Sequence, residues 1–284
     1  MHEPALRAAA FGSDPLPGPA VVRGAETPRE RLLAAIVLGA QGRYAAAATL
    51  LDPLRRQGDP FLASLAASTL GSHRRQLGGH RHARALDGEA FARAAPLTGD
   101  PDPDGLDAAG ARADALLGLA ADNLALGRLG AARRLAGRAA AEDAGWRARV
   151  RGGWVGAEIE LAAGQGAAAV PHARRAFETA LARGARRHAT KSGIVLAVAL
   201  RAVGAPDHQE ISDDLVGNAI ATAEECELLS LLWPAALVAA DLRPGHAEEY
   251  RFRVAQVLHA VLRSADPCGR RIAGESPWVP ARGS

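Results

Sequence analysis

The chain has 284 residues, of which 48% are hydrophobic and 4% are aromatic, and its formal net charge is +3. Alanine and leucine supply most of the hydrophobic content and are strong helix formers, whereas the residues that strands favour are scarce. The composition therefore argues against a sheet-based fold and predicts an all-helical one.

Charge is distributed unevenly along the chain. Residues 1–204 contain 27 basic and 19 acidic side chains, residues 205–249 contain 1 and 10, and residues 250–284 contain 6 and 2. Arginine dominates the basic residues, a bias that a GC-rich coding sequence would also produce, so it does not by itself indicate recognition. The charge separation could steer a partner or pair neighbouring copies through the acidic 205–249 region.

Nothing in the sequence indicates secretion or membrane insertion. Cys226 lies in a helical run and Cys268 in a Pro/Gly-rich segment, so we expect no structural disulfide. The first residues lack a basic stretch followed by an apolar one, and no window reaches the roughly 18 apolar residues that span a bilayer. We therefore expect a cytoplasmic protein with no membrane partner.

The first 26 residues contain four prolines and no sustained periodicity, which predicts a flexible N-terminal arm over 1–26. A helix start follows directly. Thr27 has the residue type of an N-cap, Pro28 suits the first helical position, and Glu30 completes the spacing of a capping box.

A helical-hairpin pattern then appears four times, each copy with a glycine at the turn and an alanine five residues later. The four turns are Gly42 to Ala47, Gly78 to Ala83, Gly127 to Ala132 and Gly164 to Ala169. Glycine is expected where a helix ends in a left-handed residue. The alanine would sit on the first turn of the next helix, where only a methyl group fits against the preceding one.

The turn glycines lie 36, 49 and 37 residues apart, and the longer interval contains an inserted loop at 96–105. The loop's prolines would end one helix, and Asp104 could cap the next. This period, together with the Gly42-Arg43-Tyr44 turn, Ala47 and the apolar positions around them, resembles tetratricopeptide repeats. The resemblance is degenerate in the later copies and covers about 28–203. It implies antiparallel helix hairpins stacked as a right-handed α-solenoid.

Beyond Gly204 the glycine signature is lost, although helical periodicity continues. The stretch 207–229 is acidic and amphipathic, 230–242 is apolar, and 246–265 is amphipathic. Since a repeat array needs a terminal element with a polar outer face, we predict a repeat array over 27–204 and C-terminal capping helices over 205–265. The segment 266–284 lacks a packing pattern and is predicted to be a flexible tail.

In tetratricopeptide arrays the first helix of each pair lines a concave groove, so the resemblance implies a basic groove in this chain. The candidates to project into it and bind a partner are Arg74, Arg75, Arg112, Arg147, Arg151, Arg187 and Lys191. Arginine forks match carboxylates and phosphates. A metal site from His73, His80 and His82 is the weaker alternative at the second turn, because no cysteine or carboxylate arrangement supports it. We therefore predict no metal.

The sequence contains no recognisable catalytic or nucleotide-binding motif, so we expect no catalytic residues and no cofactor. Our interpretation is a non-catalytic scaffold or adaptor that binds a protein or an acidic peptide segment in the basic groove. One alternative is a regulatory module acting with a bacterial transcription regulator or sigma factor. A helical enzyme without a familiar motif is another, because catalytic groups can come from distant residues. The absence of aromatic interleaving and of a helix-turn-helix reader argues against nucleic acid.

Overall fold

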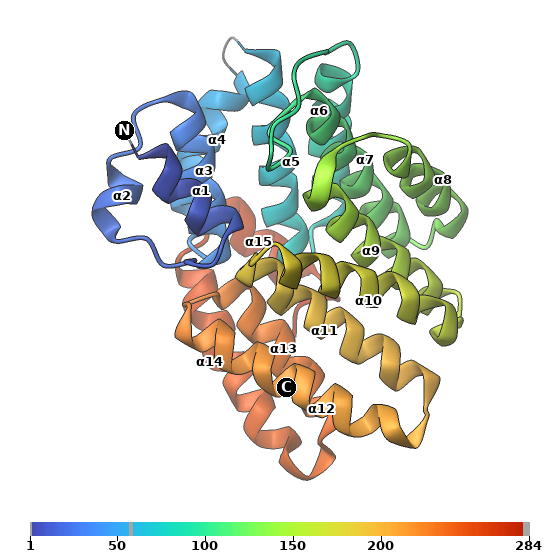
Figure 1. Ribbon diagram of the computed structural model, residues 1–284. Coiled ribbons are helices and arrows are strands. Elements are labelled where there is room, and N and C mark those ends of the chain that lie inside the picture. The colour runs from blue at the N-terminus through green and yellow to red at the C-terminus, as the bar shows by residue number, and fades with distance from the viewer. Residues whose placement is uncertain (1, 57–58, 281–284) are drawn as a thin grey trace.

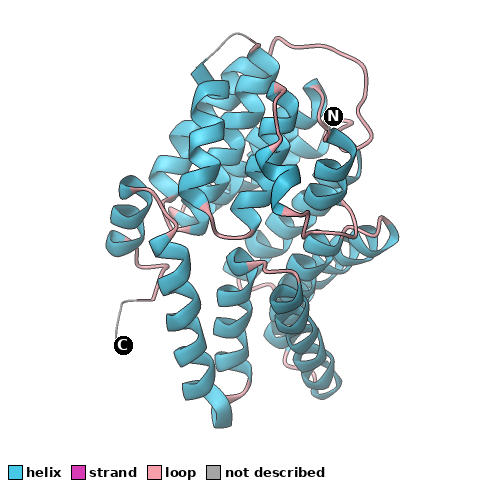
Figure 2. Cartoon of the chain, turned by 90° about the vertical axis from the view of Figure 1, so that its left-hand side faces the viewer, coloured by secondary structure: helices cyan, strands magenta, loops and turns pink. Residues whose placement is uncertain are grey.

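The computed structural model describes residues 2–56 and 59–280, and all regular structure in these residues is helical. Figure 2 shows helices joined by loops. The α-helices are α1 (Glu3–Phe11), α2 (Pro19–Arg23), α3 (Pro28–Ala40), α4 (Tyr44–Arg56), α5 (Pro60–Gln76), α6 (His80–Ala94), α7 (Ala108–Ala125), α8 (Leu129–Ala140), α9 (Gly145–Ala162), α10 (Gly166–Ala182), α11 (Arg186–Val203), α12 (Pro206–Glu225), α13 (Leu229–Leu242), α14 (Ala247–Arg263) and α15 (Pro267–Glu275). A 3₁₀ turn, Pro244–His246, precedes α14. The all-helical prediction is confirmed.

The four predicted turns have the backbone that their glycines suggest. Gly42, Gly78, Gly127 and Gly164 all have φ between +72° and +75°, the left-handed conformation that glycine adopts without a steric penalty. Each turn joins one helix to the next, and the two helices of each pair pack together. The alanines at 47, 83, 132 and 169 are fully buried, as expected for positions where only a methyl group fits.

The helix-turn-helix geometry continues beyond residue 204. Gly204 ends α11 with φ +75°, and Glu227 takes the equivalent left-handed position between α12 and α13 with φ +51°. Because this residue is a glutamate, a pattern based on turn glycines does not detect the turn. Consecutive helices from α11 to α14 pack against each other as the earlier ones do.

The structure also tests the predicted helix starts. The capping box is present at α3, where the Thr27 side chain accepts a hydrogen bond from the Glu30 backbone N–H and the Glu30 carboxylate accepts one from Thr27. The assignment of Asp104 as the cap of the following helix was wrong. Asp107 caps α7 by accepting from the Gly110 backbone N–H at 2.7 Å, and Asp104 instead forms an ion pair with Arg7.

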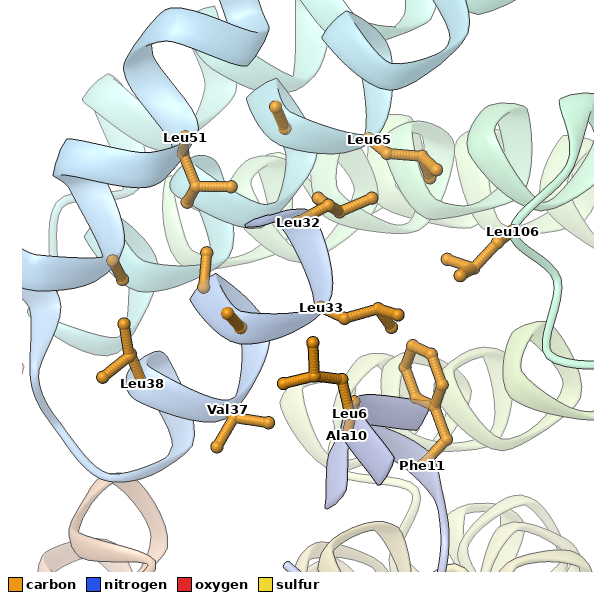
Figure 3. Packing of buried hydrophobic residues seen from close by; sticks show 14 of the residues in the cluster. Leu6, Ala10, Phe11, Leu32, Leu33, Val37, Leu38, Leu51, Leu65 and Leu106 are labelled. Atoms are coloured by element: carbon orange, nitrogen blue, oxygen red, sulfur yellow. The ribbon is translucent and has the colours of Figure 1, made fainter. Parts of the chain in front are cut away.

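The N-terminal segment departs from the predicted flexible arm, because residues 3–11 form α1 and pack against α3 and α11. Figure 3 shows Leu6 and Phe11 of α1 meeting Leu33 and Val37 of α3. Leu6 is fully buried, and the Arg186 backbone N–H donates to the Gly12 carbonyl at 3.0 Å. Residue 1 lies outside the described residues. The prediction failed because α1 is only nine residues long and lies among four prolines, at positions 4, 15, 17 and 19.

The prediction of a flexible tail over 266–284 was likewise wrong for the residues described, 266–280. Asp266 caps α15 and forms an ion pair with Arg74 at 2.7 Å. Ile272 of α15 is buried, and the Ser276 hydroxyl donates to the Gly78 carbonyl at 3.3 Å. Residues 281–284 lie outside the described residues.

The two ends of the chain therefore pack together. Tyr44 and Leu77 from the N-terminal half share a hydrophobic cluster with Leu228, Val261 and Ile272. The Ala45 backbone N–H donates to the Ser264 carbonyl at 2.9 Å, and α3 contacts α13. In Figure 1 the blue helices accordingly lie beside the orange and red ones. In the part of the chain that the structure describes, no helix is both long and apolar enough to cross a bilayer.

Candidate functional site

Six alternate helices, α3, α5, α7, α9, α11 and α13, contribute side chains to one central cavity. Its narrower part, the cationic pocket, has a volume of about 130 Å³ and is also lined by Phe11 of α1. Its wider part, the apolar chamber, has a volume of about 620 Å³. Arg151, Trp154 and Lys191 line both parts, so the two are continuous.

An ion-paired triad forms one wall of the cationic pocket. Asp114 of α7 accepts hydrogen bonds from both Arg147 and Arg151 of α9. Burial opposes ionisation of Asp114, but the two guanidiniums outweigh it and hold its pKa below the usual value. Since two cations share one carboxylate, this wall keeps a net positive charge.

Helix α11, which packs against α9, carries two further cations without an acidic partner. Among the described residues, neither Arg187 nor Lys191 of α11 lies within 4.0 Å of a carboxylate oxygen. Arg187 is half-buried, its Nε has no hydrogen-bond partner, and burial together with nearby Arg147 and Arg151 lowers its pKa to about 10. A half-buried cation without a counter-ion loses part of its hydration with no compensating ion pair, so these groups are candidates to receive an anion.

Lys191 is held over an aromatic ring. Its Nζ lies 4.5 Å from the centroid of the Trp154 ring, a cation–π distance. Trp154 is fixed in turn by a 2.7 Å hydrogen bond from its Nε1 to the Ser192 hydroxyl and by stacking on His188, with ring centroids 5.8 Å apart. Burial lowers the pKa of Lys191.

Two buried histidines complete the cationic pocket without adding charge. Burial, followed by the charges of Arg187 and Arg74, lowers the pKa of His73 to about 3, and burial also lowers the pKa of His188 far below its usual value. Both imidazoles are therefore neutral near pH 7, and the Nδ1 of each lacks a hydrogen-bond partner. The pocket thus presents four cations against one carboxylate, with unsatisfied polar atoms among them.

A second buried charge network lies beside the apolar chamber. The Arg75 Nε donates to Asp122 at 2.8 Å, and the same guanidinium contacts Asp87. Asp87 fits there because residues 71 and 118 are glycines, and a Cβ at 118 would lie 2.3 Å from the carboxylate. Burial raises the pKa of Asp87 to about 7, with Arg75 opposing the shift. Two carboxylates share one guanidinium here, and the Asp87 Oδ1 has no hydrogen-bond partner, so Arg75 is already paired within the protein.

Five of the seven predicted site residues lie together at the cavity: Arg75, Arg147, Arg151, Arg187 and Lys191. Arg74 is excluded from that group because it pairs with Asp266. A position next to Arg75 on a helix necessarily points elsewhere. Arg112, in the first turns of α7, donates to Glu142 at 2.9 Å and to the Leu97 carbonyl at 2.7 Å, so it anchors the inserted loop. Whether the five bind a partner stays a prediction.

Sequence reasoning missed several residues of the site. Phe11 was assigned to a flexible arm, yet it lines the cationic pocket. The Arg147 guanidinium lies over its ring, with the Cζ atom 4.8 Å from the ring centroid. Trp154 and Asp114 also line the pocket and were not among the predicted site residues. The i,i+4 spacings of Arg147 with Arg151 and of Arg187 with Lys191 were the available signal, because such pairs share a helix face.

The three histidines considered for a metal site have different surroundings. His73 lines the cationic pocket, His80 lies 3.2 Å from Asp122, and His82 is exposed. Among the residues described, no three His, Cys, Asp or Glu side chains form a group that could hold a metal ion.

No protein-family model matches this sequence, and no curated protein is significantly similar to it. The assignment of the site therefore depends on its geometry. The arrangement can hold an anion at the two unpaired cations, and the adjoining chamber is lined mainly by apolar side chains.

Proposed function

We propose that this chain is a tetratricopeptide-like, right-handed α-solenoid that acts in the cytoplasm as a non-catalytic binding scaffold. The proposal is supported by the repeated left-handed turns and by the convergence of alternate helices on one cavity. In this arrangement the first helix of each pair faces inward and the second faces outward. The chain would bind a protein partner through an acidic segment that enters the basic cavity.

The observation that carries this proposal is the pair of unpaired cations on α11. A carboxylate brought to Arg187 and Lys191 would form charge-assisted hydrogen bonds and would satisfy the Arg187 Nε. The two residues sit one helical turn apart, so they present their charges on the same face. Arg147 and Arg151 stay positioned by Asp114, and they add attraction at longer range.

A titration with a short glutamate-rich peptide tests the proposal. We expect wild-type binding that weakens with added salt, because the attraction is electrostatic. Arg187→Gln should weaken binding by about tenfold or more, as expected for loss of hydrogen bonds to a charged group. The matched control is Arg134→Gln, which removes an exposed guanidinium on α8. Equal losses in the two variants would show that net charge, and not the cavity, attracts the peptide.

A further inference from the structure

The apolar chamber is larger and less polar than an acidic peptide requires. Its walls include Leu117, Leu124, Val155, Ile194, Val198 and Trp233, contributed by four different helices. Its volume of about 620 Å³ lies in the range of about 300–1,000 Å³ typical of small-molecule sites. Such sites combine apolar walls with a few placed polar groups, and this chamber opens onto the cationic pocket.

The two parts of the cavity are arranged end to end. Lys191 and Trp154 line both, whereas Arg187 lines the cationic pocket, and Ile194 and Val198, further along α11, line the chamber. One helix therefore presents cations at its first turns and aliphatic side chains at the following ones. A ligand lying along α11 would meet cations at one end and mainly apolar surface along its body, where Arg75, His80 and Glu158 also line the chamber.

We propose that the central cavity binds a small amphipathic anion, with an anionic headgroup at Arg187 and Lys191 and an apolar body in the chamber. A carboxylate with an alkyl or aromatic body has this chemistry, and a monoalkyl phosphate shares it. This inference goes beyond the docking of a partner segment, although both use the same two cations. A bound small anion would consequently compete with an acidic peptide for Arg187 and Lys191.

Calorimetric titration of the full chain with decanoate tests the inference. Decanoate, used below its micellar concentration, should bind, while 1-decanol and acetate should each bind at least about tenfold more weakly, because each lacks one of the two required parts. Decyl phosphate in a parallel titration distinguishes the headgroup: tighter binding than decanoate would assign the site to phosphate esters. Equal affinity for decanoate and 1-decanol would overturn the inference without any variant.

Three variants locate the bound molecule. Lys191→Met keeps most of the length of the side chain and removes its charge, and Arg187→Gln removes the charge of the second cation with a shorter side chain; each should weaken decanoate binding by about tenfold. Ala121→Phe places a ring in the chamber and should abolish decanoate binding while leaving the glutamate-rich peptide bound. Thermal unfolding verifies that each variant is folded. Decanoate binding that survives both Lys191→Met and Ala121→Phe would contradict the proposal.

The outcomes also separate this inference from the proposed scaffold function. Peptide binding without decanoate binding would refute the small-molecule site and leave the scaffold function supported. Decanoate binding without peptide binding would refute the scaffold function and leave the small-molecule site supported. Since Ala121 lies in the chamber and not in the cationic pocket, its variant probes the two functions independently.

Discussion

The turn between α12 and α13 offers a direct test of the repeated turn geometry. Among the described residues, Glu227 alone combines a side chain with a positive φ, +51°. Its side chain is exposed and has no ion-pair partner within the described chain. The backbone hydrogen bonding of the turn is retained around it, since the Leu228 N–H donates to the Ala223 carbonyl at 2.8 Å. Glu227→Gly should therefore relieve backbone strain and break no contact.

The magnitude follows from two opposing effects. A non-glycine residue in the left-handed conformation costs about 1–2 kcal/mol, whereas glycine adds about 0.5–1 kcal/mol of unfolded-chain entropy. The difference predicts stabilisation by about 0.5–1 kcal/mol. For a chain somewhat longer than 250 residues, this raises Tm by roughly 1–3 °C, which calorimetry or circular dichroism can measure.

Two control variants separate turn geometry from a general effect of glycine. Ala221→Gly, at an exposed position inside α12, should destabilise by about 1 kcal/mol because glycine is a poor helix former. Gly127→Ala adds a methyl group into open space at φ +75°, so any loss of stability comes from backbone strain alone. A Glu227→Gly variant no more stable than wild type would refute the left-handed assignment of this turn.

Three further predictions concern packing, pH and assembly. Gly39→Ala would place a Cβ 1.9 Å from the His73 Nε2 and should lower the free energy of unfolding by about 1–3 kcal/mol through overpacking. Its control, Gly137→Ala on the exposed face of α8, should raise it by about 1 kcal/mol; an unchanged free energy of urea unfolding in Gly39→Ala would contradict the close packing of Gly39 on His73. The pKa of His73 is lowered by burial from 6.5 to about 3, so the unfolded chain binds protons more tightly and stability present above about pH 6.5 is lost as pH falls toward 3. His73→Gln should flatten that slope in pH-dependent urea unfolding, and an unchanged slope would show that His188 or other groups cause it. Self-association through 205–249 should appear in sedimentation at low salt and high protein concentration, and a monomer under those conditions would exclude it.

The turns and helix starts could be predicted because single residues specify them. A glycine in the left-handed conformation, a buried alanine after it and the capping box at Thr27 and Glu30 each follow from local backbone chemistry. The turn at Glu227 was missed because a glutamate does not indicate a left-handed conformation, and tertiary packing imposes that conformation there. Local signals thus locate helices but not every junction between them.

The packing of the two chain ends could not be predicted from local signals. Leu6 and Phe11 lie on a helix of only nine residues, and their burial depends on surfaces offered by α3 and α11. Arg74 and Arg75 have equivalent sequence contexts, yet one pairs with Asp266, 192 residues away, and the other with Asp87 and Asp122. Contacts between distant segments decide which cation faces the cavity.

Lys191 is the one lysine in the sequence, so a sample labelled with ¹³C-lysine gives a single side-chain signal from the centre of the proposed site. We predict that this signal titrates with a pKa below that of an ordinary lysine, because of burial and nearby guanidiniums such as Arg151. Saturating glutamate-rich peptide should shift the signal and raise the pKa, since a carboxylate stabilises the ammonium. An ordinary pKa and a signal unmoved by peptide would contradict the claim that the alternate helices enclose an anion-binding cavity.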